Sequence, residues 1–379
     1  VTRERLQGRS HPSAMKHTAL NPNPEAIDAF VGLDLGDRYS AVCILSHDAE
    51  VQKRFRCHTT PEGFAKHFAQ RPRVRIALEA GGQSAWISAQ LRGYGHEVIV
   101  ANPRQLALIT RNIGKSDPGD AETLARLARA DQHLLKPVHH RSAEAQAHLA
   151  ILRARDTVVR ARTKLINCAR GIAKLTGHRL PPTLSTTYSQ RASAQVPPEW
   201  TDALEPLLKQ IDQLSETIKD YDARIERTAR QHYDAPVRRL SSTAGVGTLT
   251  ALAFVLTLGN DPHRFAKSRD VGPFLGLNPK RRQSGDEDPQ LGITKAGNPL
   301  MRRLLVQCAH YVLGRFGPDS ALRQWGLKMA DRGGTRARKR AVVAVARKLA
   351  VILHHLWVSG EDFQPFPACH RQAKTAAQD

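Results

Sequence analysis

The chain has 379 residues, which is long enough for roughly two or three domains with separate hydrophobic cores. Lysine and arginine number 57 against 35 acidic residues, and the resulting net charge of +22 favours a nucleic-acid partner. Aromatic residues make up only 5%, so we expect phosphate contacts to dominate over base stacking. The five cysteines are scattered without a C-x-x-C pair, which excludes a disulfide framework and a zinc ribbon and favours a reducing compartment.

Neither a signal peptide nor a membrane-spanning segment is expected. The longest apolar run, Ala341–Trp357, is interrupted by Arg347 and Lys348. We therefore expect a cytoplasmic protein with no membrane partner. The 17 histidines show no H-E-x-x-H or zinc-finger spacing, and most are predicted to lie at the surface or to face nucleic acid.

The chain begins with a polar, aperiodic segment, residues 1–28, which we expect to be a mobile tail. Phe30–Leu45 follows, and its two β-prone runs on either side of a short polar turn predict a β-hairpin. Asp34 stands in the first strand. A carboxylate in an apolar strand needs a partner, so we expect a cation, a metal or an arginine to face it. The open alternative is that Asp34 only accepts hydrogen bonds from turn amides.

Strands and helices are predicted to alternate up to Ala130, which indicates an α/β layered domain. The strand Val74–Glu79 ends in a carboxylate, and acidic residues at strand ends lie where such sheets bind ligands. The other predicted strands are Val51–His58 and Glu97–Ala101, and the predicted helices are Pro61–Gln70, Ser84–Leu91, Pro103–Arg111 and Asp120–Ala130.

The segment Lys115–Ala121, which reads KSDPGDA, places Asp117 and Asp120 three positions apart at a helix start. Alone, this pattern is more typical of an N-cap with its capping-box partner. Together with Asp34 and Glu79, however, the carboxylates of one domain would repel each other by roughly 4 kcal/mol per pair, at about 4 Å and an effective dielectric near 20. Two Mg²⁺ ions would remove this repulsion and hold a phosphodiester between them. Asp34, Glu79, Asp117 and Asp120 are therefore the predicted catalytic residues and Mg²⁺ ligands.

The middle of the chain is predicted to form a helical hairpin. Ser142–Leu175 is helix-like, and a loop rich in Pro, Ser and Thr, Leu180–Pro198, joins it to a second helix. The second helix has apolar residues at alternating spacings of three and four, which is an a/d seam: Leu204, Leu207, Ile211, Leu214, Ile218, Tyr221 and Ile225. The first helix has arginines that favour a nucleic-acid backbone but also suit an ordinary solvated face: Arg153, Arg155, Arg160, Arg162 and Arg170.

Beyond Leu240, Gly245-Val246-Gly247 separates two helical runs. The arrangement resembles a helix-hairpin-helix, in which glycines let backbone N–H groups approach a phosphate. Gly245 and Gly247 are therefore candidate nucleic-acid contacts. A plain tight turn between packed helices is the open alternative.

Three motifs of the first half, G-L-D-L-G, L-E-A-G-G and K-S-D-P-G-D-A, resemble the DEDD tetrad of insertion sequence 110 family transposases. Members of this family usually have E-x-T-G at the second motif, where this chain has Gly81 in place of Thr. In the second half, Phe274–Gly285 (FLGLNPKRRQSG) and Gly292–Leu305 (GITKAGNPLMRRLL) are similar to the family's C-terminal domain. The resemblance covers Phe30–Leu313.

The resemblance implies an α/β plus all-α fold that begins with a RuvC-like (RNase H-like) DEDD domain at 29–138. A helical coiled-coil region at 139–235 would follow, and in the family such a region serves protomer contacts. The resemblance places a mainly α-helical C-terminal transposase domain, with the helix-hairpin-helix-like element, at 236–360, and a tail at 361–379. It also implies a homo-oligomer, a dimer or a tetramer. The DNA partners would be element ends and a target, and a structured noncoding guide RNA is implied as well.

By the same resemblance, Ser284 matches the family's nucleophilic serine, which would form a covalent phosphoserine intermediate with DNA. Without the resemblance, a serine before a glycine in a basic loop is most often a turn residue. Basic residues of the two C-terminal motifs are expected to contact nucleic acid: Lys280, Arg281, Arg282, Lys295, Arg302 and Arg303.

Three alternative functions stay open. A metal-dependent resolvase-like nuclease would use the carboxylates alone. An actin-like or sugar-kinase-like ATPase also has a G-x-D-x-G strand, but the basic charge and the lack of a second acidic, glycine-rich phosphate loop in the sequence argue against it. A noncatalytic DNA-binding protein derived from a transposase is the third.

Overall fold

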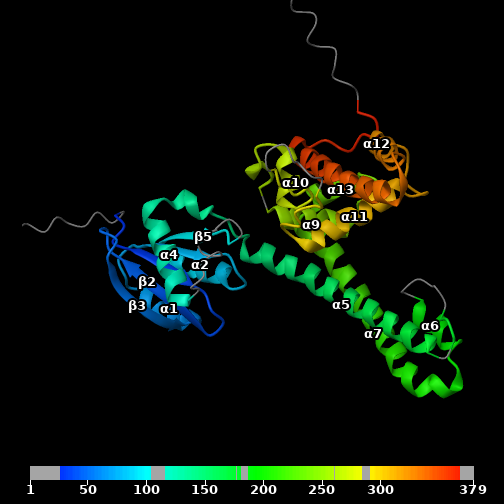
Figure 1. Ribbon diagram of the computed structural model, residues 1–379, viewed down its shortest axis with the longest axis horizontal. Coiled ribbons are helices and arrows are strands. Elements are labelled where there is room, and N and C mark those ends of the chain that lie inside the picture. Colours follow the sequence, from blue (N-terminus) through cyan, green and yellow to red (C-terminus); the bar gives the residue numbers. More distant parts are fainter. Residues whose placement is uncertain are drawn as a thin grey trace, which may run out of the picture. The chain divides into compact units, whose positions relative to one another are not determined.

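The computed structural model describes residues 26–103, 116–175, 177–180, 187–259, 261–283 and 291–367 (Figure 1). The chain divides into two compact units, Val1–His140 (unit 1) and Arg141–Asp379 (unit 2). Unit 1 is an α/β structure and unit 2 is built of helices. At this level the predicted α/β plus all-α fold class is confirmed.

Unit 1 contains a mixed sheet of five strands in the order β3-β2-β1-β4-β5. β1 pairs antiparallel with β2, which confirms the predicted hairpin, and pairs parallel with β4 on its other side. The strands are β1 Phe30–Asp34, β2 Tyr39–Leu45, β3 Val51–His58, β4 Arg75–Glu79 and β5 Glu97–Ala101. The predicted strands match these bounds closely because buried and polar side chains alternate in them or apolar runs end at turns.

One face of the sheet packs against α1 (Pro61–Phe68) and α2 (Ser84–Gly93). Val31 on β1 and Ile76 on β4 lie in this core together with Phe64 of α1, and all three side chains are fully buried. This layer supplies the main apolar core of unit 1.

The opposite face of the sheet packs against α4 (Asp117–Ala130), through Ala121 and Ala125. Gly32 of β1 permits this close approach, because an added Cβ would lie 1.8 Å from the Ala121 carbonyl oxygen and 2.6 Å from the Ala125 nitrogen. The short helix η1 (Gln132–Leu135) follows α4. The helix predicted over Pro103–Arg111 falls outside the described residues except for Pro103.

Gly32→Ala should separate α4 from β1, because the new methyl group would overlap backbone that cannot rotate away. We expect unit 1 to lose about 3 kcal/mol of stability, measured as urea-dependent hydrogen exchange of β1 peptides by mass spectrometry. Gly93→Ala is the matched control, since a Cβ there meets no atom within 4 Å. Equal effects of the two substitutions would contradict the proposed contact.

Unit 2 begins with the predicted helical hairpin. α5 (Ala143–Lys174) and α7 (Thr201–His232) pack along each other (Figure 1, green). The predicted joining loop is wrong in part, because it contains a short helix, α6 (Tyr188–Ser193), followed by η2 (Pro198–Trp200). Tyr188 is fully buried, and the guanidinium of Arg170 lies 5.0 Å from its ring centroid.

Four of the predicted seam positions of α7 are confirmed as buried: Leu204, Ile211, Ile218 and Ile225. Leu207 and Leu214 are only half-buried, because Leu208 and Ser215 take the inner positions. Ser215 leaves room for the buried Arg162 of α5, whose Nη1 donates to Ser215 Oγ at 3.1 Å. A polar pair therefore replaces one apolar layer of the hairpin.

The rest of unit 2 is a helical core around α9 (Thr248–Leu258), which is buried along nearly its whole length. A helix that is apolar on all sides belongs in the centre of a core. The surrounding elements are α8 Asp234–Ser241, η3 Pro262–Arg264, η4 Ser268–Asp270, α10 Val271–Phe274, α11 Pro299–Leu313, α12 Ala321–Ala330 and α13 Gly334–Ser359.

Among the described helices, only α13 is long and apolar enough to cross a membrane by length and composition. Its Ala341, Val345, Leu349 and Leu353 are buried in the core of unit 2. Packing against the neighbouring helices therefore explains the apolar character of α13.

Two histidines lie inside the units and are exceptions to the predicted surface position of most histidines. His96 of unit 1 is 4% exposed and His354 of unit 2 is 1% exposed. His96 Nε2 donates to the Phe68 carbonyl at 2.9 Å, and its Nδ1 accepts from the Val74 N–H at 3.4 Å. This arrangement requires the neutral ring, and burial lowers the pKa of His96.

His354 makes the same pair of contacts, with Nε2 donating to the Pro262 carbonyl at 2.9 Å and Nδ1 facing Ser268 Oγ at 2.9 Å. Burial lowers its pKa below the ordinary value of 6.5, and the nearby His263 and His355 add to this effect. A lowered histidine pKa stabilises the folded state above pH 6.5, and this stability is lost as the pH falls through the folded-state pKa.

We therefore expect the unfolding free energy of unit 2 to fall below pH 6.5, by up to about 1.4 kcal/mol per pH unit for one such group. His354→Gln should flatten this dependence in urea unfolding curves measured from pH 8 to pH 5. An exposed histidine on α11 supplies the control, His310→Gln, which should keep the wild-type slope. A wild-type slope in the His354 variant would contradict the assignment.

Candidate active site

Two of the predicted carboxylates stand at the ends of neighbouring parallel strands. The register pairs Leu33 with Leu78, so Asp34 and Glu79 are the next residues along β1 and β4. Both are half-buried. Asp34 follows Gly32 by two positions and therefore lies on the sheet face that α4 covers. Glu79 lies on the same face, two positions after Ala77, which packs with α4 residues.

The direction of α4 brings the other two carboxylates to the same end of the sheet. Ala128 accepts a hydrogen bond from Arg75 at the start of β4, and Ala121 lies over Gly32 in the middle of β1. The helix therefore runs antiparallel to these strands, and its first turn, with Asp117 and Asp120, points toward their carboxyl ends.

Burial separates the two acidic residues of this turn. Asp120 is 5% exposed, and Asp117 is exposed. A nearly buried carboxylate is costly unless cations or hydrogen-bond donors offset its charge. The structure thus brings Asp34, Glu79 and the start of α4 to one sheet edge, as the strand-end positions predicted.

The loops that follow β1 and β4 are tied together by residues that sequence reasoning missed. Gln83 Nε2 donates to the Gly36 and Asp37 carbonyls at 3.5 and 3.4 Å. Ser84 Oγ donates to the Gly81 carbonyl at 2.8 Å and lies 3.0 Å from His140 Nε2. The sequence signals only the Ser84 turn, through Gly81-Gly82, and gives no sign of His140.

The donor set at the sheet edge suits a hard divalent cation such as Mg²⁺, which prefers carboxylate oxygens. A second group of possible ligands lies in unit 2, where ligand atoms of Glu144, His148 and His232 come within 4.8 Å of one another. There Glu144 Oε1 lies 2.9 Å from His232 Nδ1, and burial lowers the pKa of His148. Imidazole ligands suit transition metals better than Mg²⁺, so this group does not match the predicted chemistry.

The basic C-terminal motifs form two loops that pair with each other in unit 2. The Lys280 N–H donates to the Gly292 carbonyl and the Thr294 N–H donates to the Asn278 carbonyl, both at 2.9 Å. Pro279 and Ile293 form the bridge between them. We call residues 275–283 and 291–298 the paired loops.

Two glycines with positive φ make this pairing possible. Gly276 has φ +69° and Gly297 has φ +73°. A Cβ on Gly276 would lie 2.2 Å from the Ala296 oxygen, and one on Gly297 would lie 2.2 Å from the Phe274 oxygen. The loops therefore approach more closely than any other residue type allows.

The predicted basic residues divide into two groups. Lys280, Arg281, Arg282 and Lys295 are exposed on the paired loops. Arg302, in contrast, donates through Nη1 to the Leu275 carbonyl at 3.1 Å and also to the Ala296 carbonyl, so it fastens the loops. The exposed Arg303 forms an ion pair with Asp156. The predicted nucleophile, Ser284, lies outside the described residues.

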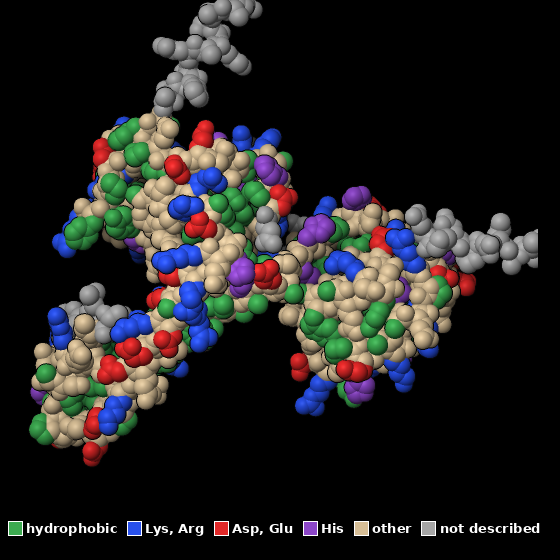
Figure 2. Space-filling view, turned by 180° about the vertical axis from the view of Figure 1, so that it is seen from behind, with side chains coloured by type: hydrophobic (Ala, Val, Ile, Leu, Met, Phe, Trp, Pro, Cys, Tyr) green, Lys and Arg blue, Asp and Glu red, His purple; other side chains and the backbone are tan. Residues whose placement is uncertain are grey.

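Part of the basic charge predicted to contact nucleic acid on α5 is used inside unit 2. Arg155 Nε pairs with Asp222 Oδ1 at 2.6 Å, Arg162 faces Ser215, and Arg170 stacks over Tyr188. On the face shown in Figure 2, carboxylates lie among the lysine and arginine side chains of the helical hairpin. The exposed members of the predicted set are Arg153 and Arg160.

The Gly245–Gly247 turn joins α8 to α9. Gly245 has φ +81°, and a Cβ there would lie 2.7 Å from Tyr311 Cδ1, so this glycine serves packing against α11. Gly247 is the N-cap of α9, and no atom lies within 4 Å of its Cβ position. Gly247 is therefore the member of the pair that leaves space for a phosphate at a helix N-terminus.

Comparison with known families adds to this geometry. A family model described as a transposase matches residues 31–177, and a second, described as the Transposase IS116/IS110/IS902 family, matches residues 237–325. The carboxylate edge of unit 1 lies in the first match, and the Gly245–Gly247 turn and the paired loops lie in the second.

Similar proteins cover most of the chain. The transposase for insertion sequence element IS1328 of Yersinia enterocolitica is 29% identical over 88% of this chain and 98% of its own length. The transposase for insertion sequence element IS1111A of Coxiella burnetii is 29% identical over 76% of this chain and 79% of its own. A probable family 20 transposase of Pseudomonas aeruginosa is 30% identical over 76% and 84%.

The α/β unit with its acidic edge, the helical unit and these similarities define a transposase, an enzyme that acts on DNA. More narrowly, the chain belongs to the IS110 family of insertion-sequence transposases, which confirms the resemblance found in its motifs.

The two groups of basic residues should respond differently to substitution. Arg302→Ala leaves two carbonyls without their donor and should lower the stability of unit 2 by about 2 kcal/mol. Lys295→Gln should leave the melting temperature unchanged and weaken nucleic-acid binding, with the log–log salt slope reduced by about 0.9. Melting curves and DNA affinities at four salt concentrations test both. The assignment is wrong if Lys295→Gln lowers the stability of unit 2. It is also wrong if Arg302→Ala weakens nucleic-acid binding while the stability of unit 2 stays unchanged.

Proposed function

We propose that this transposase cuts and rejoins DNA strands to move an insertion element, with the Mg²⁺ chemistry at the carboxylates of unit 1. The observation that carries the proposal is the shared register of Asp34 and Glu79 on parallel strands, with the acidic first turn of α4 directed to the same edge. Structural acids are seldom concentrated in this way on one buried sheet face. The mixed sheet with acidic strand ends supports a RuvC-like (RNase H-like) domain at 29–138.

Asp34, Glu79, Asp117 and Asp120 would hold the metal. Bound there, Mg²⁺ would offset their mutual repulsion, polarise a phosphodiester and activate a hydroxyl nucleophile. The chain's own part is to hold these oxygens in place: α4 is fixed by its contact at Gly32, and Gln83 ties the loop after β4 to the loop after β1. Such preorganisation is what a metal site needs from its surroundings.

The second half of the proposed chemistry belongs to Ser284. Its hydroxyl would give up its proton, and the oxygen would form a bond to phosphorus while the bond from phosphorus to one strand's oxygen breaks. That strand oxygen would take up a proton as the strand leaves. The new phosphoserine would keep the energy of the broken bond for rejoining to another strand. Lys280 and Arg281, held by the paired loops, would neutralise charge that grows on the phosphate oxygens.

The same resemblance leads us to propose the partners. The excess of cations, +22 overall, suits both element DNA and a structured guide RNA. We propose a homo-oligomer, either a dimer or a tetramer, whose protomers contact each other through the coiled-coil region 139–235. The C-terminal transposase domain would then span residues 236–360. The carboxylates and Ser284 belong to different units of the chain. The setting would be the cytoplasm.

Asp34→Asn and Ser284→Ala should separate the two parts of the reaction. Asp34→Asn removes one negative charge with little change of shape and should lower strand cleavage in Mg²⁺ by roughly a hundredfold or more. Ser284→Ala should bind DNA normally yet form no covalent protein–DNA adduct on a suicide substrate and no recombinant. Both reactions are followed on denaturing gels with end-labelled element DNA and the element's own RNA.

Asp48→Asn is the control for charge, since this exposed acid lies in the turn between β2 and β3, at the other end of the sheet. It should cleave like wild type. Wild-type cleavage by Asp34→Asn would contradict the assignment of Asp34 as a Mg²⁺ ligand. Recombination by Ser284→Ala, or an adduct at another residue, would leave a metal-dependent nuclease as the better description.

A further inference from the structure

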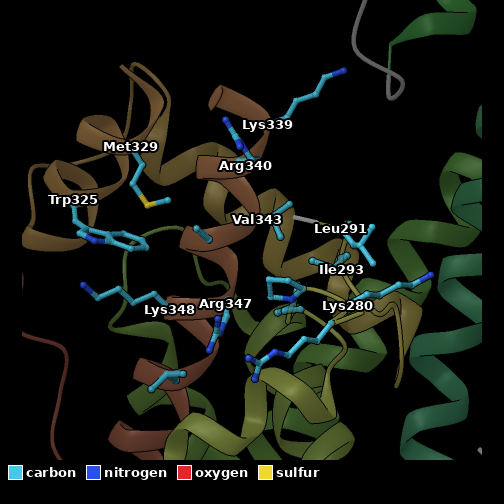
Figure 3. A pocket seen from close by; sticks show the side chains of 16 residues that line it. Lys280, Leu291, Ile293, Trp325, Met329, Lys339, Arg340, Val343, Arg347 and Lys348 are labelled. Atoms are coloured by element: carbon cyan, nitrogen blue, oxygen red, sulfur yellow. The ribbon is translucent and has the colours of Figure 1, made fainter. Parts of the chain in front are cut away.

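A large hollow lies along one side of α13 in unit 2, bounded by α12 and by the paired loops (Figure 3). Its volume is about 1050 Å³. Sites for small organic molecules usually measure roughly 300–1,000 Å³, so this hollow is large enough for a few linked nucleotides and much too large for one ion.

The charge of the lining points to an anionic ligand. Its charged side chains are all cations: Lys280, Arg281, Lys339, Arg340, Arg347 and Lys348. No carboxylate stands among the described lining residues. These cations come from two separate segments, the loop 275–283 and α13, and a positive charge gathered in one hollow attracts a polyanion.

The floor of the same hollow is apolar and contains an indole ring. Trp325 and Met329 of α12 line it together with Ile293 of the paired loops and Val343 of α13 (Figure 3). Lys348 Nζ lies 4.5 Å from the Trp325 ring centroid, a cation–π contact that orients the indole.

Close packing of α12 on α13 sets the place of this ring. Gly326, next to Trp325, is buried, and a Cβ there would lie 2.5 Å from Val345 Cγ2 of α13. The indole of Trp325 therefore belongs to a rigid part of the floor, and a ligand can stack on it without the entropy cost of ordering the side chain.

Phosphate-binding cations above an apolar, aromatic floor match the chemistry of an unpaired nucleotide. Duplex DNA would offer phosphates to the cations but would keep its base faces stacked and paired, so Trp325 and Ile293 would gain no contact. An unpaired strand offers both the phosphate charge and a free base face, and aromatic stacking of this kind tolerates any base.

We propose that this hollow binds unpaired nucleotides of a nucleic-acid strand, with a base stacked at Trp325 and the neighbouring phosphates held by Lys339, Arg340 and Arg347. The inference extends the proposed function, since strand cutting and rejoining expose unpaired bases. The binding itself requires neither Mg²⁺ nor Ser284, so it can fail or hold independently of the recombination chemistry.

The test measures binding of a fluorescein-labelled 12-nucleotide oligothymidine to the full chain in EDTA, by fluorescence anisotropy. Trp325→Ala should weaken binding roughly tenfold, the usual effect of losing one base–aromatic stack. Trp325→Phe should keep most of the affinity. Phe316→Ala, which removes an aromatic ring that is 71% exposed in the same unit, should bind like wild type.

A strand of abasic sugar-phosphate units of the same length separates stacking from charge. Wild type and Trp325→Ala should bind it equally and weakly. Oligouridine in place of oligothymidine shows whether RNA or DNA fits better. Ultraviolet cross-linking of wild type to a strand with 5-iododeoxyuridine should give an adduct in the peptide that contains Trp325 or Met329, which keeps the test valid if Trp325→Ala is unstable.

Several results would overturn the proposal. One is an equal loss of affinity for the normal and the abasic strand in Trp325→Ala, because the cations alone would then account for binding. Others are no loss at all, competition by duplex DNA as strong as by single strand, and adducts only outside α12. Protection of the hollow by a second copy of the chain, seen in hydrogen exchange without nucleic acid, would assign it to protein contact instead.

Discussion

The backbone contact between Gly32 of β1 and Ala121 of α4 is the constraint on which the carboxylate edge depends. A helix that carries Asp117 and Asp120 can contribute to a site with Asp34 only if it lies directly on the strand, without a side chain between them. The glycine and the aspartate are two positions apart, so one strand face provides both the contact and the charge. The acidic residues are thus placed by apolar packing, which works against their mutual repulsion.

In unit 2, close backbone contacts at glycines likewise position cations. Gly276 and Gly297 let two loop backbones approach within the space that a Cβ would need, and Arg302 then fastens both loops through their carbonyl groups. The exposed Lys280 and Arg281 are presented from a backbone that is held on both sides. Charged side chains on a fixed backbone lose less entropy on binding a phosphate than they would on a free loop.

The sequence predicted what depends on local pattern and missed what depends on distant partners. Alternation of side chains or a short apolar run predicted each of the five strands described in unit 1, and the ends of two of them indicated Asp34 and Glu79. The inner positions of α7 were misassigned because Ser215, a polar residue, is required by Arg162 more than fifty positions earlier. His354 gave no signal either, since its partners lie on a segment 86 to 92 positions away.

The same limit applies to charge. Burial lowers the pKa of Arg141, Arg162 and Arg264, yet a guanidinium stays protonated and must be matched by acceptors. Arg264 donates to the Leu258 carbonyl at 2.8 Å, and Arg141 binds carbonyls at the same end of α9. Arginine suits this task because its planar fork can reach two carbonyls at once. The net charge therefore indicates the class of partner, and the positions of the cations in the structure indicate where nucleic acid binds. Around the hollow beside α13, cations face apolar surface with no carboxylate among the described lining residues, which is why the structure, more than the composition, points there.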